Sequence, residues 1–139
     1  MKNIFLLFIL CLFFACGDPD DGNPILPDVA VNQTIYLNNP ANNALLFTGG
    51  YVEIGGGIKG IVVYRGAGEQ FFAYDLACPH LNPSACTKMI IEDAFFMVCT
   101  CDETKFSLAL GGAPQSGTKY PAKEYKVTKS GETLVIRNF

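Results

Sequence analysis

The residues that could carry chemistry in this chain are cysteines and one histidine. Two of the six cysteines lie in an apolar leader, and the other four form two short clusters: Cys78, Cys86, Cys99 and Cys101. The lone histidine, His80, belongs to the first cluster, CPHLNPSAC. The second cluster reads CTC, and a Cys-x-Cys pair does not provide the Cβ geometry of a disulfide. We therefore expect Cys99 and Cys101 each to have a partner elsewhere in the chain.

The segment between the clusters, MIIEDAFFMV, predicts a β-hairpin with a turn at IEDA. A hairpin returns the chain to its starting point, so both clusters should meet at one end of a sheet. His80 follows Cys78 by two residues in a loop with a proline on either side. This position favours a metal-ligand role for the imidazole over a role in packing.

Strands are the elements that must position these side chains. From Val31 onward, period-two alternation and runs of β-branched or aromatic residues mark the segments 34–38, 44–54, 60–76, 89–99 and 124–136. The turns RGAGEQ, IEDA and TKSGET interrupt three of these segments, which is typical of hairpins. No window shows a helical apolar stripe. The sequence predicts one all-β domain of antiparallel hairpins at residues 31–139.

The first sixteen residues, MKNIFLLFILCLFFAC, combine a lysine, an apolar run and a small residue before Cys16. This pattern indicates a signal peptide at residues 1–15. FFAC resembles a bacterial lipobox, with Phe13 where leucine is usual. The resemblance implies a lipid on Cys16 and a cell-envelope location, anchored in the outer membrane and facing the periplasm or the cell exterior. An uncleaved N-terminal anchor is the alternative.

Residues 16–30 predict a disordered acidic tether. Residues 17–29 alone hold four Asp, three Pro and two Gly with little apolar surface to bury. Acidic residues directly after the lipidated cysteine resemble the surface-export signal of Bacteroidetes lipoproteins. The formal charge of the whole chain is −3, and the absence of a basic run argues against nucleic acid as a partner.

Taken together, CPHLNPSAC and CTCDETKF resemble the two-loop site of Rieske iron–sulfur proteins. This family holds a [2Fe–2S] cluster with Cys-x-His in one loop and Cys-x-x-His in the other. The resemblance extends to the flanking segments and implies an antiparallel β-sandwich in which two hairpin loops form the site. It implies Cys78, His80 and Cys99 as ligands. It also implies that Cys86 and Cys101 form the bracing disulfide found in some members.

The chain departs from the family pattern at the second histidine. Asp102 occupies that ligand position, and Glu103 follows where glycine is usual. The spacing from Cys78 to Cys86 is also longer than the short form of the motif. Asp102 is therefore the expected fourth metal ligand, with a harder and charged donor in place of imidazole.

Three interpretations of this site remain open. In the first, Cys78, His80, Cys99 and Asp102 bind a [2Fe–2S] cluster, and the protein transfers electrons at the cell envelope. In the second, no cluster is present, Cys86–Cys101 and Cys78–Cys99 are disulfides, and the domain has a structural or binding role. In the third, the four ligands hold one Zn²⁺, which accepts thiolate, imidazole and carboxylate donors.

Export chemistry bears on this choice. The leader contains no twin arginine, which indicates export as an unfolded chain. A cluster assembled in the cytoplasm would not survive that route, and an oxidising compartment favours disulfides. No other set of residues suggests catalysis, so we expect an electron carrier at most and not a stand-alone enzyme. The membrane is the expected partner through the lipid, and any redox or protein partner stays unidentified.

Overall fold

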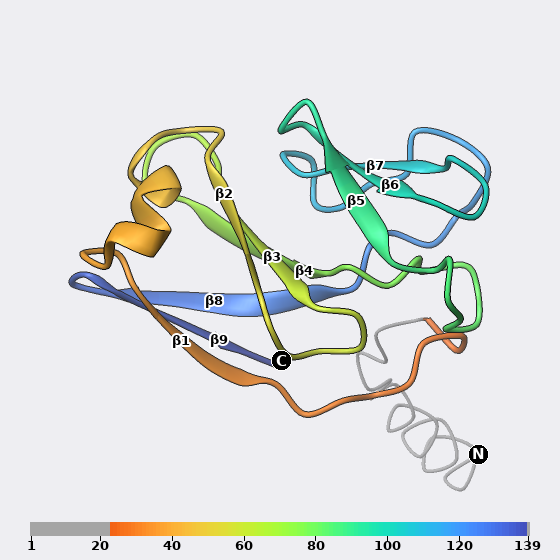
Figure 1. Ribbon diagram of the computed structural model, residues 1–139, viewed down its shortest axis with the longest axis horizontal. Helices are drawn as coiled ribbons and strands as arrows, with labels where there is room; N and C mark the ends of the chain where they lie inside the picture. The colour runs from red at the N-terminus through yellow and green to blue at the C-terminus, as the bar shows by residue number, and fades with distance from the viewer. Residues whose placement is uncertain (1–22, 139) are drawn as a thin grey trace, which may run out of the picture.

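The computed structural model describes residues 23–138, and the regular secondary structure of this part of the chain is β apart from one short 3₁₀ helix (Figure 1). Its strands form two antiparallel sheets, one of six strands and one of three. The predicted all-β antiparallel fold is confirmed. No helix within residues 23–138 is long and apolar enough to cross a membrane. The leader, Cys16 and the start of the tether lie outside the described residues.

The larger sheet has the strand order β1-β9-β8-β4-β3-β2. Its strands are β1 (Asn32–Tyr36), β2 (Tyr51–Ile54), β3 (Ile61–Arg65), β4 (Phe71–Asp75), β8 (Glu124–Ser130) and β9 (Thr133–Arg137). The smaller sheet consists of β5 (Met89–Glu92), β6 (Phe96–Cys99) and β7 (Lys105–Ser107), in that order. The three predicted turns connect β3 to β4, β5 to β6 and β8 to β9, so these hairpins are confirmed.

The larger sheet is covered on both faces at its centre, because alternate residues of β3 and β4 belong to different cores. Ile61 and Val63 point into a core enclosed by the larger sheet itself. Val62 and Tyr64 point into a second core shared with the smaller sheet. This two-sided burial explains why the β3 segment reads as a continuous apolar run. The second core contains both Cys78 and Cys99.

One predicted strand segment is partly helical. Residues 44–46 belong to a short 3₁₀ helix, η1 (Pro40–Leu46), and the strand begins only at Tyr51. Asn39 caps this helix, because its side chain accepts a hydrogen bond from the backbone N–H of Ala41. Pro40 has the backbone φ that a first helical turn requires. The cap and the proline override the apolar character of the Ala44–Leu46 segment.

The described part of the predicted tether is packed against the domain. Leu26 is buried, with 7% of its surface exposed. Asn23 Nδ2 donates a 2.7 Å hydrogen bond to the carbonyl of Pro79. The backbone of Val29 and Val31 bonds to the side chain of Asn138. Composition predicted a free segment from 16 to 30, but residues 23–30 are held by these specific contacts.

A buried carboxylate fixes the point at which β4 leads into the first cysteine cluster. Asp75 is fully buried and accepts hydrogen bonds from the backbone N–H groups of Ile58, Lys59 and Ala77 and from the Tyr125 hydroxyl. Burial and the Asp75 carboxylate raise the pKa of Tyr125 above its ordinary value. These bonds tie the Gly-rich loop between β2 and β3 to the end of β4.

Candidate functional site

The two cysteine clusters meet where β4 and β6 end. Cys99 is the last residue of β6 and lies opposite Met89 of β5. Upstream of β5, Ala77 pairs with Lys88, which places Cys78 beside the end of β6. The predicted convergence of the two clusters at one end of a sheet is therefore confirmed.

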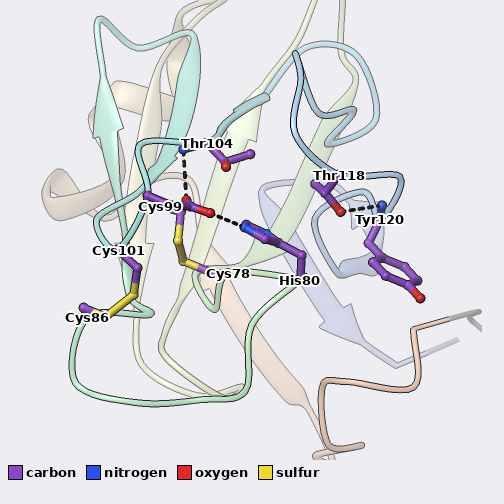
Figure 2. Close-up of polar contacts among 9 residues, drawn as sticks. Cys78, His80, Cys86, Cys99, Cys101, Thr104, Thr118 and Tyr120 are labelled. Atoms are coloured by element: carbon purple, nitrogen blue, oxygen red, sulfur yellow. Dashed lines mark hydrogen bonds and ion pairs between the residues drawn. A yellow bond between two sulfur atoms is a disulfide. The ribbon is translucent and has the colours of Figure 1, made fainter.

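All four cysteines of the site form disulfides. Cys78 bonds to Cys99 with an S–S distance of 2.09 Å, and Cys86 bonds to Cys101 with 2.10 Å (Figure 2). The first bond lies in the shared core, where both residues have 0% exposure. Its pairing is that of the clusterless interpretation, whereas Cys86–Cys101 is the brace implied by the Rieske resemblance. Cys99 and Cys101 each have a partner in the other cluster, as the spacing of the two residues predicts.

His80 and Asp102 form a close pair beside the buried disulfide. Nε2 of His80 lies 2.6 Å from Oδ2 of Asp102, and the side chains are 12% and 40% exposed. Figure 2 shows the His80 side chain extending from its loop toward Cys99. The ring also lies 5.9 Å from that of Phe106, measured between centroids. In the sequence, Asp102 occupies the position at which the Rieske pattern has its second histidine. In the fold, Asp102 faces His80, the single histidine of this chain.

The local backbone holds Asp102 in this orientation. Its Oδ1 accepts a 3.1 Å hydrogen bond from the backbone N–H of Thr104. Desolvation raises the pKa of Asp102, but hydrogen bonds from His80 and Thr104 outweigh it and leave the pKa below its usual value. Glu103 has a φ of 62° and donates its N–H to the carbonyl of Cys99 at 2.8 Å. Glycine, the usual residue here, adopts this φ without strain.

Four hydrogen bonds between three pairs of residues shape the first loop, and the sequence analysis did not predict them. Thr87 Oγ1 donates to the Ser84 carbonyl at 3.0 Å and accepts from the Ser84 N–H at 2.7 Å. Thr100 Oγ1 donates to the carbonyl of Cys86 at 2.5 Å, which joins the two loops. Lys59 Nζ donates to the Ser84 carbonyl at 2.8 Å. The Ser-x-x-Thr spacing is a local signal for the first contact, but the other two depend on tertiary proximity.

The donor set does not fit a Rieske cluster in this form of the protein. Such a cluster needs two thiolates on one iron and two imidazoles on the other. The sulfurs of Cys78 and Cys99 are bonded to each other, and the chain has a single histidine. Three donor atoms nevertheless converge, because a ring nitrogen of His80, the sulfur of Cys99 and a carboxylate oxygen of Asp102 lie within 4.8 Å of one another.

Comparisons with known proteins identify the fold. No protein-family model and no curated protein sequence matches the chain. Among solved structures, a protein described as the small subunit of an NADH-dependent nitrite reductase from Mycobacterium tuberculosis aligns with a TM-score of 0.50 and 14% identity, over 81% of this chain and 98% of its own. This chain has a Rieske-like fold.

Two ferredoxins have similar structures at lower scores. The ferredoxin of carbazole 1,9a-dioxygenase from Nocardioides aromaticivorans has a TM-score of 0.49 and 16% identity, over 81% of this chain and 100% of its own. A Sphingomonas yanoikuyae ferredoxin has a TM-score of 0.45 and 23% identity, over 67% of this chain and 89% of its own. The antiparallel Rieske-like fold expected from the sequence is confirmed by the sheet topology and by the alignment with the nitrite reductase small subunit.

Proposed function

We propose that this protein is an envelope-anchored Rieske-like domain in which a disulfide takes the place of the iron–sulfur cluster. Its role is then structural or in binding a protein partner at the envelope. One observation carries the proposal: the two cysteines that match the cluster ligands form a buried bond with each other. With both sulfurs in that bond, neither Cys78 nor Cys99 offers a thiolate to iron.

The proposal has a physical rationale in the stability of the domain. The bond from Cys78 to Cys99 spans 21 residues and that from Cys86 to Cys101 spans 15. Closing loops of this size stabilises a fold by about 3 kcal/mol each in the chain-entropy description. The two loops that would otherwise need a cluster to hold them together are joined by covalent bonds. Disulfides are also the state that cysteines favour in an oxidising compartment.

Attachment to the membrane through a lipid on Cys16 is part of the proposal. The sequence pattern supports it, and Cys16 itself lies outside the described residues. Asn23, the first described residue, bonds to Pro79 in the loop that carries His80. Figure 1 shows the start of the described chain, in orange, near the green loop between β4 and β5. The end of the domain that holds the disulfides would then lie close to the anchored end of the chain.

Native mass spectrometry of the exported protein, prepared without reductant, tests the proposal. We expect a mass that is lower than that of the fully reduced chain by two hydrogens per disulfide, with no metal. Peptide mapping should then recover the Cys78–Cys99 and Cys86–Cys101 pairs. A mass excess equal to two irons and two sulfides would contradict the proposal.

One-electron transfer through a [2Fe–2S] cluster is the second candidate function. The observation in its favour is that Cys78, His80, Cys99 and Asp102, which occupy the four ligand positions of the family, lie together at one end of the fold. The cluster would require an open Cys78–Cys99 bond and Asp102 as a ligand to iron. Restoring the family ligand with Asp102→His should then raise cluster occupancy in protein made in the cytoplasm. Protein of this variant that stays colourless after reconstitution would count against a latent Rieske site.

A further inference from the structure

We propose that the reduced protein has a site for a single divalent metal ion, best suited to Zn²⁺, with Cys78, His80, Cys99 and Asp102 as ligands. The proposed function concerns the oxidised form, and this inference rests on it, because the same two sulfurs form either the disulfide or the metal site. The two loops at this end of the domain would therefore be joined in one of two ways, by the Cys78–Cys99 disulfide or by the metal ion.

The positions of the donors favour one ion over a two-iron cluster. A ring nitrogen of His80, the sulfur of Cys99 and an oxygen of Asp102 lie within 4.8 Å of one another, and the sulfur of Cys78 is 2.09 Å from that of Cys99. From Zn–S, Zn–N and Zn–O bond lengths, ligands of a tetrahedral site lie about 3.3–3.8 Å apart. Opening the S–S bond and small side-chain movements would give this spacing. In a Rieske cluster, by contrast, the sulfurs and the imidazoles bind different irons.

The imidazole of His80 can present a lone pair to zinc beside the Asp102 carboxylate. Nε2 is engaged by Asp102, whereas Nδ1 is buried and has no hydrogen-bond partner in the described part of the chain. With its proton on Nδ1, neutral imidazole presents its one lone pair at Nε2, next to the Asp102 oxygen, so both atoms can bind the same zinc ion. The carboxylate of Asp102, held by Thr104, completes a mixed sulfur, nitrogen and oxygen set that zinc accepts.

The change between the two states balances with a dithiol as the reductant. The dithiol gives two electrons and two protons to the Cys78–Cys99 bond and becomes a disulfide itself, leaving two thiols on the domain. One Zn²⁺ then binds these sulfurs as thiolates and releases two protons. The Cys86–Cys101 bond takes no part in the metal site, so its removal should leave the site intact.

The test uses the full-length chain carrying Cys11→Ser, Cys16→Ser, Cys86→Ser and Cys101→Ser, so that Cys78 and Cys99 are its only thiols. The protein is unfolded with a phosphine reductant, refolded and titrated with Co²⁺ as the spectroscopic probe and then with Zn²⁺. We expect one Co²⁺ per chain, with the visible absorption bands of a tetrahedral site that includes thiolates, and displacement by one Zn²⁺. Folding that occurs only when the metal is added would also support the site.

Two further variants separate ligation from general effects of charge. Asp102→Asn should weaken Co²⁺ binding by at least about 10-fold, as loss of a ligand or of its carboxylate support does. Glu103→Gln removes the neighbouring acid, which is outside the donor set, and should leave the affinity unchanged. Equal affinities in the two variants, or reduced protein that binds no metal, would overturn the inference. Either failure would leave the proposed function standing if the oxidised wild-type protein has the mass of two disulfides.

Discussion

Replacing the cysteines of the buried bond with alanine should reveal whether that bond exists in solution. The loop between Cys78 and Cys99 spans 21 residues, for which the chain-entropy description gives about 3 kcal/mol of stabilisation. Both residues are fully buried in the shared core, so each lost sulfur adds a packing cost on the order of 1 kcal/mol. We therefore expect Cys78→Ala or Cys99→Ala to lower the free energy of unfolding by about 4 kcal/mol.

The double variant provides the decisive comparison. Once one partner is gone the bond is already lost, so the second substitution removes only packing. The double variant should lose about 5 kcal/mol, whereas independent effects would give about 8 kcal/mol. Each single variant should also melt about 15 °C lower, because 1 kcal/mol corresponds to about 4 °C in a domain of this size. The chain has no tryptophan and six tyrosines, so urea unfolding is best followed by circular dichroism or tyrosine fluorescence.

Cys86 and Cys101 supply a matched pair for this experiment. Their bond closes a loop of 15 residues, and Cys86 is exposed while Cys101 is partly buried. Each serine substitution should cost about 3 kcal/mol, and the two together should cost no more than one alone. Losses that add within either pair would refute the reasoning, because they would mean that the two cysteines do not share a bond.

Two other predictions concern residues around the site. Gly57→Ala should lower the unfolding midpoint in urea far more than Gly68→Ala. Both glycines have a positive φ, 63° and 65°, so the backbone strain of the two substitutions is matched. A Cβ at Gly57 would lie 2.3 Å from Oδ2 of Asp75, whereas a Cβ at Gly68 would meet nothing within 4 Å. The pKa of Asp102 is lower in the folded state than in the unfolded state. Its contribution to folding stability is therefore fully present above the unfolded-state pKa of about 3.9 and is lost as the pH falls through the folded-state pKa. Asp102→Asn should therefore flatten the acid limb of a plot of unfolding midpoint against pH, and an acid limb identical to that of the wild type would show that the pair with His80 contributes nothing.

Most of the fold followed from local patterns in the sequence. Period-two alternation and runs of β-branched or aromatic residues, with turn residues between them, located the three hairpins. A strand buried on one face needs the alternation, a strand buried on both faces reads as an apolar run, and a tight turn needs residues such as glycine and aspartate. The pattern failed at residues 44–46, where the Asn39 cap and Pro40 favour a 3₁₀ helix over a strand. It also failed at residues 23–30. Composition describes average behaviour, and the hydrogen bond from Asn23 to Pro79 is a single specific contact.

The sequence by itself determined that two cysteine clusters meet at one end of a β domain and that Cys99 and Cys101 do not bond to each other. Both results follow from the hairpin between the clusters and from the short reach of a Cys-x-Cys pair. The Rieske resemblance implied the Cys86–Cys101 bond but left the state of Cys78 and Cys99 open. Their bond was decided only by the tertiary structure, because it depends on the register that sets Cys99 against Met89 and on the exit of β4 toward Cys78. The contact between His80 and Asp102 was decided in the same way, because it joins two loops that are 22 residues apart in sequence.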